Sequence, residues 1–303
     1  MTGVTLITVR PGTPDDQYPC FVIFQKSLVD LVRRQGGGES VAGMDEPDRI
    51  LKAWDGYQSL YDLLGSVADQ FWVAEQDGQV IGYARSQSFD GTRELTEFFV
   101  RPGVQSGGIG RELLRRAFPA DTPRRTIIAT TDARAQALYM RSGLFPFVPC
   151  LNMVTATPTE RPVESDLDFV PLTASHLGVL ADIDRAILGF RRDAIHQWFI
   201  DTRHGFLYQR GGKAMGYGYE GVRGGPFALR DPDDFPAVLA HAENDAARES
   251  HGQWFVVPGS NHRALACLLE RGFRVDPFVV FLMTSGPFGQ LDRYVITSPE
   301  FFL

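Results

Sequence analysis

The sequence predicts an α+β protein built from two tandem copies of one domain-sized unit. Three observations lead to this prediction: a strand that runs through a glycine loop into a helix, an antiparallel run of strands before that loop, and a return of similar signals about 130 residues later. The chain has 303 residues, of which 44% are hydrophobic and 22% are charged. A chain of this length and composition can bury two ordinary hydrophobic cores.

The first copy is predicted to begin with a strand and two helices. The strand covers residues 6–10, and the helices cover residues 16–34 and 47–64, where apolar residues recur at helical spacing. Aromatic residues on the second helix are expected either to fill the core or to touch a substrate: Trp54, Tyr57 and Tyr61.

Three strands follow and are predicted to form an antiparallel meander. They cover residues 71–76, 80–86 and 94–100, which are rich in β-branched and aromatic residues. Between the first two strands stands Asp77-Gly78, a two-residue sequence typical of a hairpin turn. The third strand leads directly into the glycine loop.

This loop contains Gly107, Gly108 and Gly110 and is followed by a predicted helix. Because glycine lacks a Cβ, the backbone can turn its N–H groups toward a ligand, and the helix adds a positive dipole end. A phosphate or pyrophosphate is the expected ligand. A phosphate loop of the GxxxxGK[ST] type needs a lysine after its last glycine, and a dinucleotide fingerprint needs a third glycine at the position of Leu113. The first pattern fails and the second fits poorly.

A second motif runs from Asp132 to Leu144, after a short predicted strand at residues 125–130. The glycine loop and this motif together resemble the GNAT acyltransferases. In that family a Gln/Arg-x-x-Gly-x-Gly/Ala loop binds the pyrophosphate of coenzyme A, and a segment Asn-x-x-Ala-x-x-Leu-Tyr-x-x-x-Gly-Phe follows it. Here Asp132 replaces the Asn and Leu144 replaces the Phe. Both departures are mild, because Asp also caps a helix start and Leu is also apolar.

The resemblance implies the GNAT fold, a mostly antiparallel mixed sheet flanked by helices. It also implies an N-acetyltransferase that uses acetyl-CoA and transfers the acyl group to the amine of a small molecule or an amino acid. Main-chain N–H groups near Phe99 and Val100 are expected to polarise the thioester carbonyl. The residues expected to bind the coenzyme are Phe99, Val100, Gln105, Ser106, Gly107, Gly108, Ile109, Gly110, Arg111 and Asp132.

The implied reaction needs a base for the amine and an acid for the departing thiolate. The resemblance places the hydroxyl of Tyr139 at the coenzyme sulfur, and it makes Glu97 the base, acting through a water. Strand alternation puts Glu97 on the same face as Phe99, and Glu94, on the opposite face, is the substitute base. The alternative is that these residues are a core aromatic and two paired strand charges.

Repeated segments define the second copy. The turn and strand at residues 77–84 return at residues 211–218, and the helix at residues 135–144 returns at residues 264–273. A polar linker joins the copies. The predicted domains are an N-terminal catalytic GNAT domain at residues 1–155 and a C-terminal GNAT-like domain at residues 166–303.

The second copy lacks the glycine loop. Two carboxylates at Asp233 and Asp234, near a predicted helix start, would repel a pyrophosphate. This copy resembles the degenerate second domain of tandem bacterial GNAT proteins of the YitH-like kind. The segment from Asp184 through Gly189 to Arg192 is similar to the Asp-x-x-x-x-Gly-x-x-Arg of that domain. The C-terminal domain is expected to shape the acceptor site or to have a structural role.

Composition argues against nucleic-acid and membrane partners. The formal net charge of −7 argues against general nucleic-acid binding, and no stretch is apolar enough to span a bilayer. The N-terminus has no secretion signal, and Cys20, Cys150 and Cys267 are scattered as free thiols would be, so a cytoplasmic protein is expected. No metal spacing is present, and a monomer or homodimer is expected.

Two other functions stay open at this point. One is an acyl-CoA-binding sensor without turnover. The other is a protein or peptide acetyltransferase that modifies a lysine or an N-terminus, which would need an open acidic groove. A covering second domain favours a confined pocket for a small acceptor instead.

Overall fold

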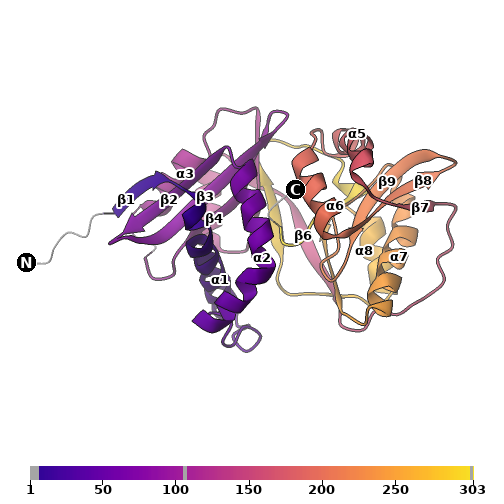
Figure 1. Ribbon diagram of the computed structural model, residues 1–303, viewed down its shortest axis with the longest axis horizontal. Coiled ribbons are helices and arrows are strands. Elements are labelled where there is room, and N and C mark those ends of the chain that lie inside the picture. The colour runs from indigo at the N-terminus through magenta and orange to yellow at the C-terminus, as the bar shows by residue number, and fades with distance from the viewer. Residues whose placement is uncertain (1–6, 105–107, 301–302) are drawn as a thin grey trace, which may run out of the picture. The chain divides into compact units, whose positions relative to one another are not determined.

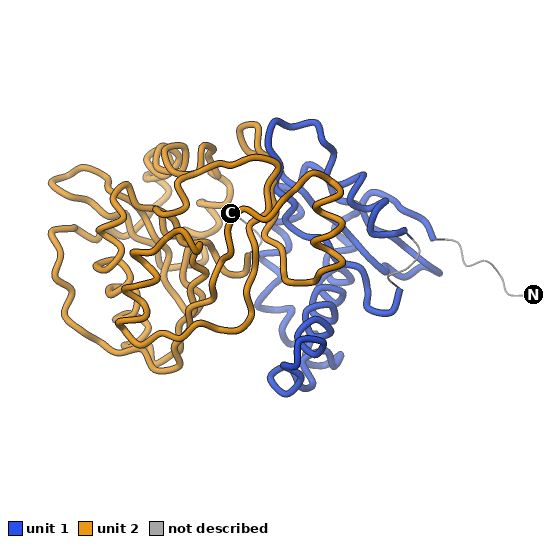
Figure 2. Tube along the Cα trace, turned by 180° about the vertical axis from the view of Figure 1, so that it is seen from behind, with its two compact units in different colours: residues 1–88, 93–125 blue, residues 89–92, 126–303 orange. Residues whose placement is uncertain are grey.

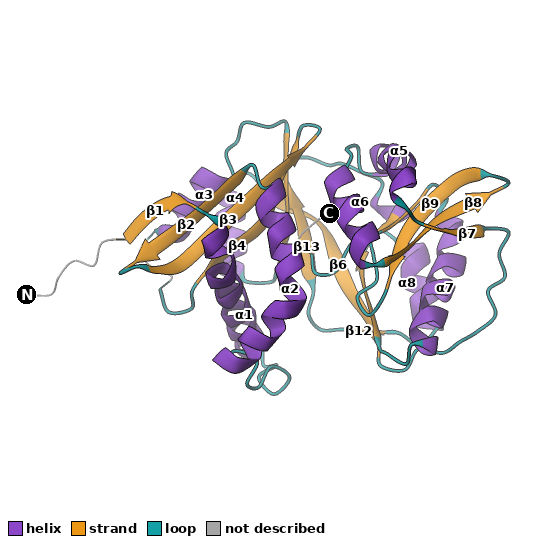
Figure 3. Ribbon diagram, in the orientation of Figure 1, coloured by secondary structure: helices purple, strands orange, loops and turns teal. Residues whose placement is uncertain are grey.

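The computed structural model describes residues 7–104, 108–300 and 303, and it divides into two compact units (Figure 1, Figure 2). The first unit comprises Met1–Ser88 and Arg93–Arg125, and the second comprises Phe89–Thr92 and Thr126–Leu303. Helices and mostly antiparallel strands occur in both units, as predicted for an α+β fold (Figure 3). None of the described helices is long and apolar enough to cross a membrane.

The first unit is built on strands in the order β1-β2-β3-β4. Strand β2 is antiparallel to both β1 and β3. Asp77 and Gly78, with φ of 51° and 73°, form the two-residue turn between β2 and β3, which confirms the predicted hairpin. The elements are β1 (Ile7–Pro11), a short 3₁₀ helix (Pro14–Asp16), α1 (Gln17–Arg34), α2 (Pro47–Val67), β2 (Gln70–Gln76), β3 (Gln79–Phe89), β4 (Thr92–Val100) and α3 (Ile109–Ala117).

The helices of the first unit contact opposite faces of these strands (Figure 1). The hydroxyl of Tyr61 on α2 lies 3.4 Å from the hydroxyl of Tyr83 on β3. On the other face, a Cβ at Gly82 would lie 3.2 Å from Cδ1 of Leu113 on α3 and 3.2 Å from the main-chain oxygen of Phe99 on β4. Glycine at position 82 therefore lets α3 and β4 come close together.

The second unit contains the remaining elements and two groups of strands. One group has the order β5-β13-β6-β11, with β12 also paired to β6, and the other has the order β14-β10-β9-β8-β7. The elements are β5 (Arg124–Ala129, which begins in the first unit), α4 (Ala133–Arg141), β6 (Phe145–Thr155), β7 (Asp168–Pro171), a 3₁₀ helix (Ala174–His176), α5 (Leu177–Ile187), α6 (Asp193–Thr202), β8 (His204–Arg210), β9 (Lys213–Glu220), β10 (Phe227–Leu229), a 3₁₀ helix (Pro232–Asp234), α7 (Phe235–Arg248), β11 (Gln253–Pro258), α8 (His262–Glu270), β12 (Arg274–Val275), β13 (Val280–Thr284), a 3₁₀ helix (Leu291–Arg293) and β14 (Tyr294–Val295).

Strand β13, close to the C-terminus, lies between β5 and β6 and is antiparallel to both. Leu282 is the partner of Ile128 on one side and of Val148 on the other. Sequence patterns did not predict this pairing, because hydrophobic periodicity identifies a strand without identifying its neighbours. Strand β6 in turn pairs with β11, so each copy of the repeat contributes a strand beside strands of the other copy.

The internal repeat is visible in local geometry. Turns with positive φ at both central residues, Asp77-Gly78 and Gly211-Gly212, join paired strands, and each pair has an irregular register just before its turn. The side chains of Asp132 and Asn261 accept backbone hydrogen bonds at the starts of α4 and α8. Glycines with positive φ follow the two helices: Gly143 and Gly272.

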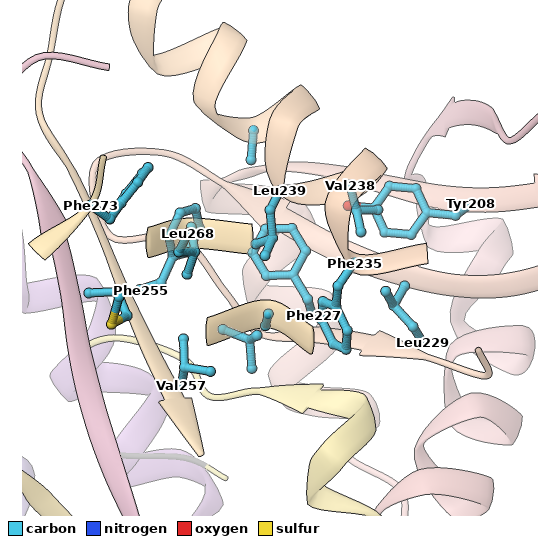
Figure 4. Close-up of a cluster of buried hydrophobic side chains, with 14 of the residues drawn as sticks. Tyr208, Phe227, Leu229, Phe235, Val238, Leu239, Phe255, Val257, Leu268 and Phe273 are labelled. Atoms are coloured by element: carbon cyan, nitrogen blue, oxygen red, sulfur yellow. The ribbon is translucent and has the colours of Figure 1, made fainter. Parts of the chain in front are cut away.

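A hydrophobic cluster of the second unit packs α7 and α8 against strands (Figure 4). Most of its side chains come from β8, β10, α7, β11 and α8, with Met153 of β6 and Val295 of β14, and the members are almost completely buried. Apart from Met153, the described members of this cluster belong to the second copy of the repeat, which therefore builds most of this core itself. The labelled members are Tyr208, Phe227, Leu229, Phe235, Val238, Leu239, Phe255, Val257, Leu268 and Phe273.

The predicted linker between the domains lies inside the second unit. Its backbone is held by α7: the N–H of Thr159 donates to Glu243, and the N–H of Arg161 donates to Asn244. The compact units therefore do not divide the chain at this linker, since β6 pairs with strands of the second copy. The assignment of residues 1–155 and 166–303 to two domains rests on the sequence repeat and stays a prediction.

The position of β13 makes Leu282 a sensitive site. Its side chain is fully buried, so Leu282→Ala should lower the free energy of unfolding by about 2–5 kcal/mol through lost burial and a residual cavity. Urea unfolding followed by circular dichroism measures the change. The matched control is Leu269→Ala on α8, where the side chain is 54% exposed and the expected change is within about 0.5 kcal/mol. Equal effects of the two substitutions would contradict the placement of β13.

Candidate active site

The glycine loop leads into α3 as the sequence predicts. Gly108 is the N-cap of α3 and has a φ of 78°, a conformation that favours glycine. No side chain among the described residues caps this helix start, so main-chain N–H groups of its first turn can point toward an anion. Ile109 is buried, Gly110 is half-buried and Arg111 is exposed. The other predicted loop residues, Gln105, Ser106 and Gly107, lie outside the described residues.

Phe99 and Val100 end the strand that precedes this loop. Both are half-buried, and the N–H of Arg101 donates a hydrogen bond to the oxygen of Ile81 on β3. The strand therefore stays attached to its neighbour up to the start of the loop. Polarisation of a thioester by main-chain N–H groups near Phe99 and Val100 stays a prediction.

Glu97, the predicted base, lies in a buried polar cluster of the first unit. Its side chain is 1% exposed. The hydroxyl of Tyr83 donates to Oε1 of Glu97 at 2.7 Å, and Nε of Arg85 lies 3.3 Å from Oε2. Burial raises the pKa of Glu97 because it disfavours the charged carboxylate, while Arg85 and the Tyr83 hydroxyl oppose this effect. The net result is a carboxylate that binds a proton more readily than an ordinary glutamate.

Glu94, the substitute base, points to the same face of the sheet as Glu97, although strand alternation predicts opposite faces. Nε2 of Gln87 donates to Oε2 of Glu94 at 3.1 Å. Gln87 alternates with Tyr83 and Arg85 on one face of β3, so both glutamates contact the same row of β3 side chains. The expectation that Glu94 faces the opposite way is therefore wrong. Residues three positions apart lie on opposite faces of a regular strand, so the shared contacts of the two glutamates depart from strict alternation.

The aromatic residues of α2 form a cluster with α1. The rings of Trp54, Tyr57 and Tyr61 lie 5.3, 5.1 and 5.5 Å from the ring of Phe21, measured between centroids. Tyr61 is fully buried, and its hydroxyl lies 3.4 Å from that of Tyr83. Of the two expectations for these residues, Tyr61 is a core residue that joins the Glu97 cluster.

Arg85 is the member of this cluster that sequence patterns did not single out. It is fully buried, and its guanidinium carbon lies 4.1 Å from the ring centroid of Phe71. The only signal in the sequence was a charged residue in an otherwise apolar segment of β3. Long charged side chains are rarely buried without a partner, and here the nearest charge is Glu97.

Tyr139, the predicted acid, lies on α4 in the second unit and is 4% exposed. Burial raises its pKa, and the charge of Asp132 adds to the effect. The phenol therefore stays protonated at neutral pH, as an acid requires. Asp132 caps α4: its carboxylate accepts from the N–H groups of Arg134 at 2.9 Å and Ala135 at 3.4 Å.

The helix start of the second copy carries acidic groups instead of a glycine loop. Asp234 is the N-cap of α7 and forms an ion pair with Arg210 at 2.6 Å, and Asp233 pairs with Arg263 at 2.9 Å. These carboxylates occupy the positive end of the helix dipole. The arrangement supports the interpretation that this copy does not bind a pyrophosphate.

The second copy also contains a buried polar network centred on Asp184. Arg192 donates to both oxygens of Asp184, at 2.9 and 3.1 Å, and Nε2 of His196 lies 2.9 Å from Oδ2. Tyr217 and Tyr294 accept hydrogen bonds from Nη2 and Nη1 of Arg192. The Asp184 to Arg192 segment noted in the sequence is therefore an internal ion pair.

Comparison with known proteins assigns a family to the first motif region. Residues 68–143 match the family model described as an acetyltransferase (GNAT) domain. The protein therefore contains a GNAT acetyltransferase domain. The matched residues begin shortly before β2 and end shortly after α4, so they include the glycine loop and the second motif up to Gly143. The match agrees with the GNAT resemblance of the two motifs.

Solved structures show the same fold over nearly the whole chain. A protein from Pyrococcus horikoshii, provisionally described as an acetyltransferase, has a TM-score of 0.73 at 15% identity and covers 97% of this chain and 95% of its own. A GCN5-related N-acetyltransferase from Sphaerobacter thermophilus has a TM-score of 0.60 at 14% identity, covering 93% and 96%. A tandem GNAT protein from the clavulanic acid biosynthesis pathway has a TM-score of 0.59 at 13% identity, covering 93% and 99%. At these identities the likeness concerns the fold alone. No curated protein sequence matches the chain.

Proposed function

We propose that this protein is an N-acetyltransferase that uses acetyl-CoA as the acyl donor and a small-molecule amine or amino acid as the acceptor. The observation that carries the proposal is the buried carboxyl of Glu97, which lies on the strand that leads into the glycine loop and has a raised pKa. A carboxylate in such surroundings takes up a proton more readily than an exposed glutamate does.

The chemistry follows from the two predicted groups. The amine must lose a proton before it attacks the thioester carbonyl, and the thiolate that leaves must be protonated. Glu97 is enclosed, so the proton of the amine reaches it through a water or through the hydroxyl of Tyr83, which already donates to Oε1. Tyr139, which is protonated at neutral pH, is the proposed donor to the thiolate. The second copy has the proposed role of a structural or acceptor-side domain.

The reaction is tested by mixing the protein with acetyl-CoA and a panel of amines and following free thiol. The panel contains small amines, free amino acids and lysine-containing peptides, so it separates the three candidate functions. Thiol release that requires a small amine supports the proposal. Coenzyme binding without thiol release for any amine would instead indicate a sensor, and release with peptides alone would indicate a protein acetyltransferase.

The glycine loop provides the first mutational prediction. Gly108→Val should abolish coenzyme binding in isothermal titration calorimetry, because a branched side chain is strained at a φ of 78° and crowds the N–H groups that face the anion. Gly78→Val is the matched control, since Gly78 has a φ of 73° and, like Gly108, open space where a Cβ would lie. The two variants should lose similar stability, but only the first should lose the coenzyme. Loss of binding in both would contradict the assignment of the loop.

The raised pKa of Glu97 predicts a pH dependence. Glu97 accepts a proton only when ionised, so kcat/KM of the natural protein should fall as the pH drops through its raised pKa. In Glu97→Gln this acid limb should be absent, and kcat should be lower by about 10²-fold. Steady-state rates between about pH 5 and 9 measure the profile. Glu94→Gln should keep the acid limb, and its loss in that variant would identify Glu94 as the base.

Tyr139 is tested by removal of its hydroxyl. Tyr139→Phe should lower kcat by about 10²-fold while the affinity for acetyl-CoA stays nearly unchanged, because the group acts on the departing thiolate. Calorimetry and thiol release measure the two quantities. Unaltered turnover would reduce Tyr139 to a packing role.

A further inference from the structure

Arg85 is a buried cation for which the protein supplies little hydrogen bonding. Its side chain is fully buried, yet Nε, Nη1 and Nη2 form no hydrogen bond with an oxygen or nitrogen of any described residue. The buried thiol of Cys20 on α1 also interacts with the guanidinium, but a thiol sulfur is a weak acceptor. Nε lies 3.3 Å from Oε2 of Glu97, and that oxygen also forms no hydrogen bond within the described residues. A guanidinium has five N–H donors, and buried donors without acceptors are costly. Such a group calls for a partner that the fold does not provide.

The other buried arginines show that this is not a general property of the protein. Arg192, in the second copy, donates through all three nitrogens to Asp184, Tyr217 and Tyr294. Arg93, on β4 of the first unit, donates to the hydroxyl of Ser86 and lies 3.4 Å from Asp121. Among the buried arginines that the structure describes, Arg85 alone donates no hydrogen bond to an oxygen.

The guanidinium of Arg85 lies against aromatic rings. The guanidinium carbon lies 4.1 Å from the ring centroid of Phe71 and 5.2 Å from that of Tyr61. Aromatic rings stack on the faces of a guanidinium, and the in-plane N–H groups stay available for a planar acceptor. Since Nε is beside Glu97, the Nη1 and Nη2 groups are the pair that a carboxylate can bridge with two parallel hydrogen bonds.

We propose that Arg85 binds the carboxylate of the acceptor and that the acceptor is a free amino acid. The proposal rests on the proposed N-acetyltransferase function and assigns its substrate class. In an α-amino acid the carboxylate and the amine are attached to one carbon, so the two groups can reach adjacent side chains. Arg85 and Glu97 are adjacent in this way, one cation for the carboxylate and one anion for the amine.

Charge balance favours this class of ligand. Arg85 and Glu97 together carry no net charge, and a zwitterionic amino acid adds none, so the buried site would hold two ion pairs. Buried charges are tolerated when they are paired and hydrogen-bonded. A phosphate dianion would instead place two negative charges beside Glu97, and a simple amine would leave the donors of Arg85 without an acceptor.

Access to Arg85 requires movement of the side chains that cover it. Tyr61 and Phe71 are the aromatic residues nearest to the guanidinium. Changes of side-chain rotamer on ligand binding are common even where the backbone stays fixed. The same movement would bring the ligand into the polar cluster of Tyr83 and Glu97.

The test compares matched acceptors. Each free amino acid that the protein acetylates is assayed beside its primary amide and its decarboxylated amine, with acetyl-CoA as donor and thiol release as readout. The natural protein should prefer the amino acid over both analogues by about 100-fold or more in kcat/KM, because the analogues leave buried donors unpaired. In Arg85→Met this ratio should fall to about threefold or less, and Arg85→Lys, which keeps the charge without the paired donors, should be intermediate.

Arg93→Met is the control, because it removes a buried arginine that has protein partners and should keep the preference. Binding of the amino acid in the presence of coenzyme A, measured by saturation-transfer NMR, gives a readout that does not need turnover. Equal use of the amino acid and its amide by the natural protein, or an unchanged preference in Arg85→Met, would overturn the assignment and leave the acyltransferase function intact.

The acyltransferase function can also fail while the binding site at Arg85 is still tested. If no amine is acetylated, the proposed function is wrong, and the NMR measurement decides on Arg85 alone. Amino-acid binding to the natural protein that is lost in Arg85→Met would then support the binding site. Absence of binding to the natural protein would overturn it.

Discussion

The pairing of β13 with both β5 and β6 is the constraint on which the rest of the second unit depends. Thr126 on β5 donates its hydroxyl to the oxygen of Met283 on β13, across 157 residues of chain. Helix α4, which carries Tyr139, connects β5 to β6 and is therefore anchored by strands on both sides of β13. The second copy thus supports the helix of the predicted acid although it has no glycine loop.

The two copies also contain contrasting buried polar clusters on their β3 and β9 strands. In the second copy, Asp184 and Arg192 saturate each other and two tyrosine hydroxyls. In the first copy, among the residues that the structure describes, neither the guanidinium of Arg85 nor Oε2 of Glu97 forms a hydrogen bond with an oxygen or nitrogen atom. A network in which every donor and acceptor is paired stabilises its surroundings. Donors that lack a protein acceptor can instead form hydrogen bonds with a ligand. The copy that has the glycine loop is therefore also the copy with unpaired buried donors.

Local sequence patterns predicted much of the first unit. The hairpin at Asp77-Gly78, the strand that carries Glu97 and the helix that Gly108 begins all depend on residues near in sequence, so short-range rules suffice for them. The orientation of Glu94 was predicted wrongly because alternation assumes a regular strand. Arg85 was missed for a different reason. A sequence shows that a strand contains a charge, but not whether an acceptor from another element reaches it.

The sequence by itself determined the type of the main elements, the internal repeat, the glycine loop and the GNAT resemblance. Each of these features depends on how residue types are spaced along the chain. Only the tertiary structure decided that β13 lies between β5 and β6, that Tyr61, Tyr83, Arg85 and Glu97 form one cluster, and that Asp184 pairs internally with Arg192. These features join residues distant in sequence. Their energy comes from burial and from donor-acceptor matching, which exist only after the chain has packed.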